Sequence, residues 1–467
     1  MLTIIDNSNK ISENPWMYKK IGIWGFGIVG QSALNYFDQQ YTQQIEILDA
    51  KQINLPKTQT PVIAILQTKE TIETFLENND FILASPGIKL HAYQQFAHKF
   101  INELDILHAK TNCSIIAITG TVGKTSITHL LENIIKHTHS KTIAAGNIGY
   151  PMLSLITNPQ DIAIIELSSF QLQPIKSFAP DLAIITNFYP NHLDHHQSID
   201  EYFQAKCNIL KYQSDEQQAL IPLNLIDQVA KLSPIKKNWA LFSPTKPTEQ
   251  EIEKYQTNAM YYLENKIVYR TQNNQTEQLF DGNALPPLTF DTNWLIIIAA
   301  CHLYKIDLAT ITSIAQNLAL PDHRLQKVGS WHGSNFYNDS KSTVWQATLQ
   351  AVQAMPTKDN KPIKLFLGGL SKGADRTPLL QALSGKNIEI YAFGKEADQI
   401  KKLCNQFKIT CQSHATLDAS WQACIQNLSQ PHEILFSPGG SSFDLFADYK
   451  ARGQYFTQLV LDLCKLI

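Results

Sequence analysis

Segment 115–126 restricts the fold of this chain more than any other stretch. It reads IIAITGTVGKTS, an apolar, β-branched run that ends in a glycine-rich turn, and a helix-compatible stretch follows at residues 127–136. A strand, a glycine turn and a helix in this order direct backbone N–H groups and the positive end of the helix dipole toward an anion. The segment therefore predicts an α/β fold in which this turn binds phosphate.

Lys124 and Thr125 make this prediction more specific. In loops of the form G-x-x-x-x-G-K-[ST], the lysine reaches the outer phosphates of a nucleotide and the hydroxyl group binds Mg²⁺. Gly123 fits this form, whereas Ile118 stands where the first glycine is expected. An ordinary strand-to-helix turn is the alternative, but Gly-Lys-Thr directly after an apolar strand favours nucleotide binding.

Length, charge and cysteine usage narrow the class of protein. A chain of 467 residues suggests roughly two to four domains, and a net charge of −2 argues against a surface that coats nucleic acid. No apolar run reaches the roughly 18 residues that span a bilayer, and the start lacks the features of a signal peptide. The seven cysteines form no C-x-x-C pair, which suits reduced thiols. We expect a cytoplasmic protein without a nucleic-acid or membrane partner.

A second strand–turn–helix unit lies near the start of the chain. Residues 20–30 read KIGIWGFGIVG, and the next strand, at residues 45–48, ends at Asp49. A G-x-G-x-x-G turn with an acidic residue after the following strand is typical of a dinucleotide site, although this motif alone is a weak signal. Later strands are expected at Val62–Leu66 and Phe81–Ala84, the latter leading into Ser85-Pro86-Gly87.

Strands and helices alternate along the rest of the chain, which predicts largely parallel sheets. We place three domains at residues 1–109, 110–320 and 321–467, and expect the polar stretch 244–276 to be a surface excursion with short strands. The remaining strands are expected at Ala163–Leu167, Leu182–Thr186, Asn335–Asn338, Ile363–Leu367, Glu389–Phe393 and Glu433–Phe436.

Polar residues after strands of the second domain are candidates for chemistry. Glu166 lies in an apolar run, where an unpaired carboxylate would be costly, so a metal ion or basic partner is predicted; an exposed strand end is the alternative. The histidines at 192–196 suggest zinc at first sight, but no Cys or Glu stands at a defined spacing. His192 near Mg²⁺ is the milder hypothesis, and His195 and His196 are expected to be solvated. Lys206 has the pattern of a surface lysine.

In the third domain, three strands are each followed by small polar residues. These segments are 338–343, 367–375 and 437–444, and two of them carry a lysine. Lysines that converge at strand ends suit an anion, so the three segments together predict a carboxylate or phosphate site.

The order of these motifs resembles that of the Mur ligases, the ATP-dependent amino-acid ligases of peptidoglycan synthesis. The resemblance covers essentially the whole chain and rests on Gly120–Thr125, Glu166–Gln171, the loop 187–192, His323-Arg324 and Asn338–Lys341. Ser437-Pro438 with Ser442 and Asp444, and Ser85-Pro86-Gly87 in a short first domain, are most similar to the branch that adds D-glutamate.

This resemblance implies a Rossmann-like UDP-binding domain, a central P-loop ATPase domain and a C-terminal Rossmann-like domain that binds the amino acid. It implies that ATP phosphorylates the terminal carboxylate of UDP-MurNAc-L-Ala, and that the amino group of D-glutamate attacks the acyl phosphate. Lysines and metal ions would stabilise the charged transition state. The first glycine turn would hold the UDP diphosphate rather than NAD. A monomer is expected.

The resemblance also implies a role for each matching residue. The catalytic residues would be Lys124, His192, Lys206 and Lys341. ATP would be bound by Gly120, Thr121, Val122, Gly123, Lys124, Thr125, Ser126, Asn293, Arg324 and Asp339. The UDP substrate would be bound by Gly27, Ile28, Val29, Asp49, Ser85, Pro86, Gly87, Asn147, Ser168 and His323. Glutamate would be bound by Thr343, Lys372, Ser442 and Phe443. Two Mg²⁺ ions, with Mn²⁺ as an alternative, would be held by Thr125, Glu166, His192 and a carbamylated Lys206.

The chain departs from the family pattern at three places. Val122 replaces an asparagine in the phosphate loop, so a polar contact is lost. Ile296 replaces the second asparagine of an Asn-x-x-Asn pattern that begins at Asn293, which puts one contact on the adenine side in doubt. Gly439-Gly440 replaces bulkier residues, which predicts a looser glutamate pocket.

Other functions remain open at this point. A sibling ligase could add L-glutamate or another amino acid to a related UDP precursor, or act in the manner of a folyl-polyglutamate enzyme. The Asp-Asn-Pro-Arg motif of the diaminopimelate-adding branch is absent from the sequence. An NAD-dependent oxidoreductase would explain only the first glycine turn, and a regulator without catalysis would leave Lys124, Glu166, His192 and Lys206 unexplained.

Overall fold

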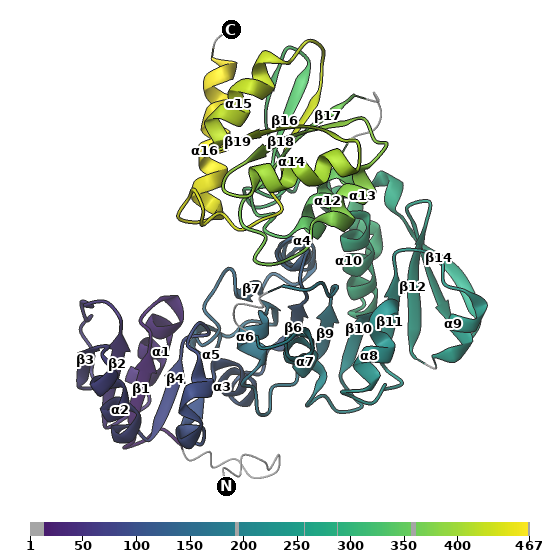
Figure 1. Cartoon of the computed structure of the whole chain (residues 1–467). Coiled ribbons are helices and arrows are strands. Elements are labelled where there is room, and N and C mark those ends of the chain that lie inside the picture. Colours follow the sequence, from purple (N-terminus) through teal and green to yellow (C-terminus); the bar gives the residue numbers. More distant parts are fainter. Residues whose placement is uncertain (1–13, 192–195, 256, 287, 356–360, 466–467) are drawn as a thin grey trace.

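The structure is a computed structural model that describes residues 14–191, 196–255, 257–286, 288–355 and 361–465. Three sheets follow one another along the chain, and helices pack around each of them (Figure 1). The first region lies beside the central one, and the third lies across the end of the central sheet from which α4 and α10 extend (Figure 1). This arrangement confirms the predicted α/β class with three mostly parallel sheets.

The first sheet is parallel throughout, with the order β3-β2-β1-β4-β5. Its strands are β1 (Lys20–Trp24), β2 (Gln44–Asp49), β3 (Val62–Leu66), β4 (Phe81–Ala84) and β5 (Phe100–Ile101). Its helices are α1 (Ile28–Asp38), α2 (Lys69–Asn78), the 3₁₀ helix η1 (Leu90–Phe96) and α3 (Glu103–Lys110). The strand order reverses between β1 and β4, so the glycine turn after β1 lies where open α/β sheets bind ligands.

A glycine at position 30 allows α1 to pack directly over this turn. A Cβ at Gly30 would lie 2.1 Å from the carbonyl oxygen of Gly25, a distance that no side chain can take. Gly25 itself has φ +91, the left-handed region that favours glycine. The turn geometry therefore depends on these two glycines.

The central sheet has the order β14-β13-β12-β11-β10-β9-β6-β8-β7. Its strands are β6 (Ser114–Thr119), β7 (Thr142–Gly146), β8 (Ile162–Glu166), β9 (Leu182–Ile185), β10 (Gln218–Pro222), β11 (Ala240–Ser243), β12 (Ala259–Glu264), β13 (Ile267–Gln272) and β14 (Gln275–Asp281). Its α-helices are α4 (Lys124–Thr138), α5 (Ser154–Thr157), α6 (Ser169–Leu172), α7 (Ile199–Cys207), α8 (Ile226–Ala230), α9 (Glu249–Lys254), α10 (Asp291–Leu303) and α11 (Ile311–Ala315). Its 3₁₀ helices are η2 (Asn208–Leu210), η3 (Leu223–Leu225), η4 (Gly282–Ala284) and η5 (Leu308–Thr310).

The polar stretch 244–276 is part of this sheet rather than a separate excursion. β12 pairs in parallel with β11, and β12, β13 and β14 then continue the sheet as antiparallel neighbours. These strands form one edge of the sheet, and the outermost strand, β14, is largely exposed, which explains its polar sequence.

The third sheet has the order β15-β16-β20-β17-β18-β19, and only β15 runs antiparallel to its neighbour. Its strands are β15 (Gln326–Trp331), β16 (Ser334–Asn338), β17 (Ile363–Gly368), β18 (Ile388–Phe393), β19 (Thr410–His414) and β20 (Glu433–Phe436). Its helices are α12 (Trp345–Ala354), α13 (Thr377–Leu383), α14 (Ala397–Gln406), α15 (Leu417–Gln426) and α16 (Tyr449–Cys464). Because β16, β20 and β17 are neighbours and run in parallel, the three predicted polar turns meet at the carboxyl ends of these strands.

α3 joins the first two regions through its side chains. Leu104 and Leu107 lie in the core of the central sheet, whereas Ile106 lies in the core of the first. The domain boundaries themselves stay a prediction. Among the described residues, no helix combines the length and the apolarity that crossing a membrane requires.

Candidate active site

A cavity of about 760 Å³ is lined by residues from all three regions. It brings together most of the residues that the sequence singled out. These are Ile28, Val29, Pro86, Thr121, Val122, Gly123, Lys124, Thr125, Ser126, Asn147, Glu166, Ser168, Lys206, Arg324, Asp339, Lys341 and Thr343.

The phosphate loop connects β6 to α4, and the two residues that follow β9 fix its backbone. Asn187 Oδ1 accepts hydrogen bonds from the N–H groups of Thr121 and Val122 at 3.2 and 2.9 Å, and Thr186 Oγ1 donates to Val122 O at 2.8 Å. Gly123 has φ +88, and α4 begins at the next residue. The backbone of residue 122 is therefore held by Thr186 and Asn187, whichever side chain residue 122 carries.

Two lysines converge on one carbonyl of this loop. Lys124 Nζ donates to Gly120 O at 2.9 Å, and Lys206 Nζ donates to the same oxygen at 2.7 Å. Burial lowers the pKa of both ammonium groups, and the charge of Lys124 lowers the pKa of Lys206 further. Lys206 is only 2% exposed, so its interpretation as a surface lysine is wrong.

Glu166 is a buried carboxylate, only 2% exposed, at the end of β8. Its Oε2 accepts from Thr125 Oγ1 at 2.6 Å, and its Oε1 accepts from Asn147 Nδ2 at 2.9 Å. The alternative of an exposed carboxylate is therefore excluded. One carboxylate and one hydroxyl beside a phosphate loop are hard oxygen donors that fit Mg²⁺, which keeps water and phosphate oxygens as its other ligands.

The described residues contain no cluster of three or more His, Cys, Asp or Glu side chains that could hold a metal ion by themselves. His192 and His195 lie outside the described residues. His196 was expected to be solvated, but it is buried: its Nε2 is 2.9 Å from Ser169 Oγ and its ring stacks on Phe170 with centroids 5.4 Å apart. The zinc interpretation therefore gains no support here.

Arg324, Asp339 and Lys341 extend from the third region to the cavity. Asp339 accepts from Ser437 Oγ at 2.7 Å and from Leu325 N at 3.2 Å, and burial raises the pKa of its carboxyl group to about 7. Burial and then the charge of Arg324 lower the pKa of Lys341 to about 8. On this side of the cavity Arg324 and Lys341 are cationic, whereas burial favours the neutral form of Asp339. The side is therefore suited to a polyphosphate.

The predicted residues of the first glycine turn mostly support the turn instead of lining the cavity. Asp49 Oδ2 accepts from Phe26 N at 2.7 Å and its Oδ1 accepts from Lys51 N at 2.8 Å, so the carboxylate holds backbone. Ser85 Oγ donates to Gly25 O at 3.3 Å. Gly27 and Gly87 are also absent from the wall, and a Cβ would meet nothing within 4 Å at either residue.

Three further predicted residues, Gly120, Asn293 and His323, are absent from the cavity wall. Gly120 supplies its carbonyl oxygen to the two lysines. Asn293 lies behind the phosphate loop, where a Cβ on Gly123 would lie 2.6 Å from Asn293 Oδ1. His323 is buried against α16, with its Nδ1 3.1 Å from Asn338 Nδ2. Its position does not support contact with the UDP substrate. Ile296 is fully buried in the apolar core around α4 and α10.

Of the four residues predicted to bind the substrate glutamate, only Thr343 lines the cavity. Ser442 is buried, Lys372 is exposed at φ +53, and Phe443 is 67% exposed and absent from the wall. Gly440 packs tightly, since a Cβ there would lie 2.5 Å from the carbonyl oxygen of Gly368, and the looser glutamate pocket stays a prediction.

The cavity also contains residues to which the sequence assigned no role, among them Gln171, Tyr202, Tyr449 and Lys450. Gln171 Oε1 accepts from Ser168 N and Ser168 Oγ at 3.0 and 2.9 Å, and the S-x-x-Q capping pattern of α6 could have revealed it. The Lys341 ammonium lies 3.8 Å from the ring centroid of Tyr449. No local pattern marks Tyr449, because its partner lies in a distant turn.

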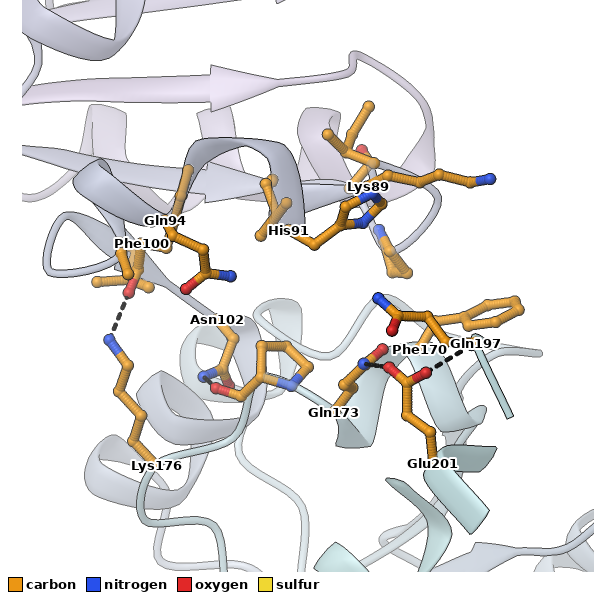
Figure 2. Close-up of a pocket in the computed structure, with 18 residues that line it drawn as sticks. Lys89, His91, Gln94, Phe100, Asn102, Phe170, Gln173, Lys176, Gln197 and Glu201 are labelled. Carbon is orange, nitrogen blue, oxygen red and sulfur yellow. Dashed lines mark hydrogen bonds between the residues drawn. The ribbon is translucent and has the colours of Figure 1, made fainter. Parts of the chain in front are cut away.

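A second cavity, of about 330 Å³, lies between the first and central regions (Figure 2). Lys176 Nζ donates across it to Phe100 O at 2.8 Å, and Glu201 accepts from Gln173 Nε2 at 2.8 Å and from Gln197 N at 2.6 Å (Figure 2). Pro86 and Phe170 line both cavities, so the two lie next to each other.

Comparisons with known proteins agree with this geometry. Residues 118–281 match the model of the Mur ligase middle domain. The chain is 30% identical over 401 residues to a UDP-N-acetylmuramoylalanine–D-glutamate ligase of Streptococcus agalactiae, covering 84% of this chain and 85% of that one. It is 28% identical over 461 residues to the same ligase of Thermoanaerobacter, covering 95% and 98%.

Solved structures show the same fold at low identity. A pseudomurein peptide ligase type C from Methanothermus fervidus superposes with a TM-score of 0.58 at 15% identity, covering 95% of this chain and 100% of that one. The chain belongs to the Mur ligase family, in the group of the UDP-N-acetylmuramoylalanine–D-glutamate ligases.

Proposed function

We propose that this protein ligates D-glutamate to UDP-N-acetylmuramoyl-L-alanine at the expense of ATP, in peptidoglycan precursor synthesis. The relatives that match almost the whole chain carry this activity in their names. The observation that carries the proposal is a single cavity that joins the phosphate loop and Glu166 to Arg324 and Lys341 of another sheet. Such a cavity can hold a nucleotide and a carboxylate acceptor side by side.

The reaction has two steps. A carboxylate oxygen of the UDP substrate attacks the γ-phosphorus of ATP, which forms an acyl phosphate and releases ADP. The amino group of D-glutamate then attacks the acyl carbon, loses a proton, and expels phosphate as the amide forms. Loop N–H groups and Lys124 would bind the phosphates, and Arg324 and Lys341 would stabilise negative charge on the transferred phosphoryl group.

Thr125 and Glu166 would hold Mg²⁺, and His192 would contribute to a second ion. When bound, Mg²⁺ neutralises charge on phosphate oxygens as a Lewis acid. Lys206 would take part as a carbamate, formed when its neutral amine adds CO₂ and releases a proton. Its lowered pKa supports this step, because the neutral amine is the reactive form.

The glycine turn after β1 would bind the diphosphate of the UDP substrate. Both carboxylate oxygens of Asp49 accept hydrogen bonds from backbone N–H groups, those of Phe26 and Lys51, which disfavours the ribose contact of an NAD enzyme. ATP as the nucleotide, a cytoplasmic location and a monomeric state are part of this proposal.

The test is ATP-dependent phosphate release with UDP-MurNAc-L-Ala and a panel of amino acids. Release with D-glutamate alone would support the proposal. Release with L-glutamate or another acid would make the protein a sibling ligase, and release with none would overturn the proposal. A change in NADH fluorescence on titration would instead favour the oxidoreductase.

A further inference from the structure

Backbone hydrogen bonds join the three polar turns of the third sheet. The turns comprise residues 338–343 after β16, 368–373 after β17 and 437–442 after β20. Gly368 N donates to Pro438 O at 2.9 Å, and Gly439 N donates to Ser342 O at 3.0 Å. The turn after β20 is therefore linked to both of the others.

Arg452 of α16 lies beneath two of these turns and is fully buried, with 0% exposed. Its Nη2 donates to Ser340 O at 2.8 Å and its Nε donates to Ser340 Oγ at 3.1 Å. Its Nη1 donates to Gly440 O at 2.9 Å. One rigid guanidinium thus connects the turn that carries Lys341 with the turn that carries Ser442.

Arg376 braces the turn after β17 in a similar way. Its Nη2 donates to Gly369 O at 2.9 Å and to Gly368 O at 3.2 Å, and its Nη1 pairs with Glu396 Oε2 at 2.5 Å. A Cβ on Gly440 would lie 2.6 Å from Nη2 of Arg376. The glycine at 440 therefore lets this arginine pack against the turn after β20.

The two arginines differ in how their charge is balanced. Arg376 has Glu396 as an ion-pair partner, whereas the hydrogen bonds of Arg452 all go to neutral oxygens of described residues. Burial lowers the pKa of Arg452 to about 10, and the more distant Asp444 and Asp339 oppose this change. A buried cation without an adjacent anion is costly, and it favours an anion that binds nearby.

We propose that Arg452 is a positioning residue of the amino-acid site. It fixes the turns that carry Lys341 and Ser442 relative to each other, and it adds positive charge beneath them. The inference rests on the proposed function and on the prediction, implied by the family resemblance, that glutamate binds at Thr343, Lys372 and Ser442 of these turns. Arg452 itself touches no substrate, so its effect passes through the turns.

The test compares Arg452→Lys, which keeps the charge but loses the planar fork, with Arg452→Met, which loses both. The KM for D-glutamate is expected to rise about ten-fold or more in Arg452→Met and less in Arg452→Lys, while the KM for ATP changes by less than about two-fold. A purely structural role would lower the active fraction, and hence the apparent kcat, without changing the KM for D-glutamate.

Lys364→Met provides the matched control. Lys364 is a buried cation of the same sheet, paired with Glu389 at 2.5 Å, but near the opposite end of β17. This variant is expected to melt at a lower temperature with an unchanged KM for D-glutamate. If neither Arg452 variant folds, Ser340→Ala removes one acceptor of the guanidinium and should raise the same KM by a smaller factor.

An unchanged KM for D-glutamate in folded Arg452→Met, or an equal rise in Lys364→Met, would overturn this inference. If only Ser340→Ala can be measured, an unchanged KM overturns it as well. Failure of the wild-type protein to release phosphate with D-glutamate would overturn the proposed function instead, so the two failures are distinguishable.

Discussion

At the scale of single residues, Lys206 is the most unusual side chain of the cavity. It shares the carbonyl oxygen of Gly120 with Lys124, and its pKa lies well below the usual range, first because of burial and then because of the neighbouring charge. Two ammonium groups at one oxygen repel each other in a site of low dielectric constant. A carbamate on Lys206 would replace this repulsion by attraction, which supports the proposed modification.

Lys206→Ala is therefore expected to reduce turnover about 100-fold or more, because a metal ligand is lost. Short carboxylic acids such as acetate should restore part of the activity by occupying the place of the carbamate. Phosphate release measures both effects. Lys211→Ala, at an exposed lysine five positions later, is the control and should keep full activity. Full activity in Lys206→Ala would refute the metal-ligand role.

Lys341 gives a prediction about pH. Its pKa is about 8 in the free protein, so the ammonium group loses its charge as the pH rises through this value. Because a neutral amine binds phosphate more weakly, kcat/KM for ATP should fall above about pH 8, since this parameter reports the free enzyme. Lys341→Arg should move the fall to higher pH, because a guanidinium keeps its proton. The same fall in both proteins would assign it to another group.

At the scale of elements, the strand β2 supports the glycine turn after β1 through Asp49. Loss of its two hydrogen bonds to backbone N–H groups in Asp49→Ala should raise the KM for the UDP substrate about ten-fold and leave the KM for ATP nearly unchanged. Asp80 is a matched control, because its carboxylate accepts from Lys20 N at the opposite end of β1. An equal effect of Asp80→Ala would mean that the first sheet is destabilised as a whole.

The first turn of α3 carries a buried carboxyl group, Glu103, whose Oε1 has no hydrogen-bond partner among the described residues. Burial raises its pKa from 4.5 to about 7, although a hydrogen bond with Gln171 opposes the rise. The folded state therefore binds more protons than the unfolded state between these values, and stability falls as the pH rises from about 4.5 to about 7.

Glu103→Gln should remove this fall. At pH 8 its free energy of unfolding should exceed that of the wild type by at most about 3 kcal/mol, whereas at pH 4 the two should be similar. Urea unfolding at both pH values measures the difference. A variant that is less stable at pH 8 would show that the carboxylate has a partner worth more than its burial costs.

At the scale of the whole molecule, the cavity exists only because the third sheet faces the central one. Arg324 comes from the third region and lies at the same cavity as the phosphate loop. A non-hydrolysable ATP analogue with Mg²⁺ should therefore connect the two regions. At about 100 times its Kd it should stabilise the fold by about 2.7 kcal/mol, visible as a rise in Tm of several degrees.

Arg324→Gln should lose much of this rise in Tm at the same analogue concentration, because its affinity for the analogue falls. Lys327→Gln, at an exposed lysine on β15 that does not line the cavity, should keep it. Equal rises in both variants would mean that the nucleotide is held by the central region alone.

Local patterns predicted the elements of this fold well. The strands Val62–Leu66, Phe81–Ala84 and Glu433–Phe436 have the expected bounds, and others differ by one residue at one or both ends. Apolar runs between glycine-rich turns depend on short-range chemistry, so sequence suffices to find them. The antiparallel strands β13 and β14 were missed as parts of a sheet because polar edge strands lack an apolar run.

By itself, the sequence determined that strand ends carry phosphate-binding and polar turns, and its resemblance to a family gave those turns an order and a reaction. Only the tertiary structure decided which side chains meet. In the folded chain Lys206 and His196 are buried, and the Lys341 ammonium lies over the ring of Tyr449. His323 and Phe443 do not line the cavity. The physical reason is that burial and charge at a site depend on contacts between distant segments, and those contacts are set by which strands become neighbours in a sheet.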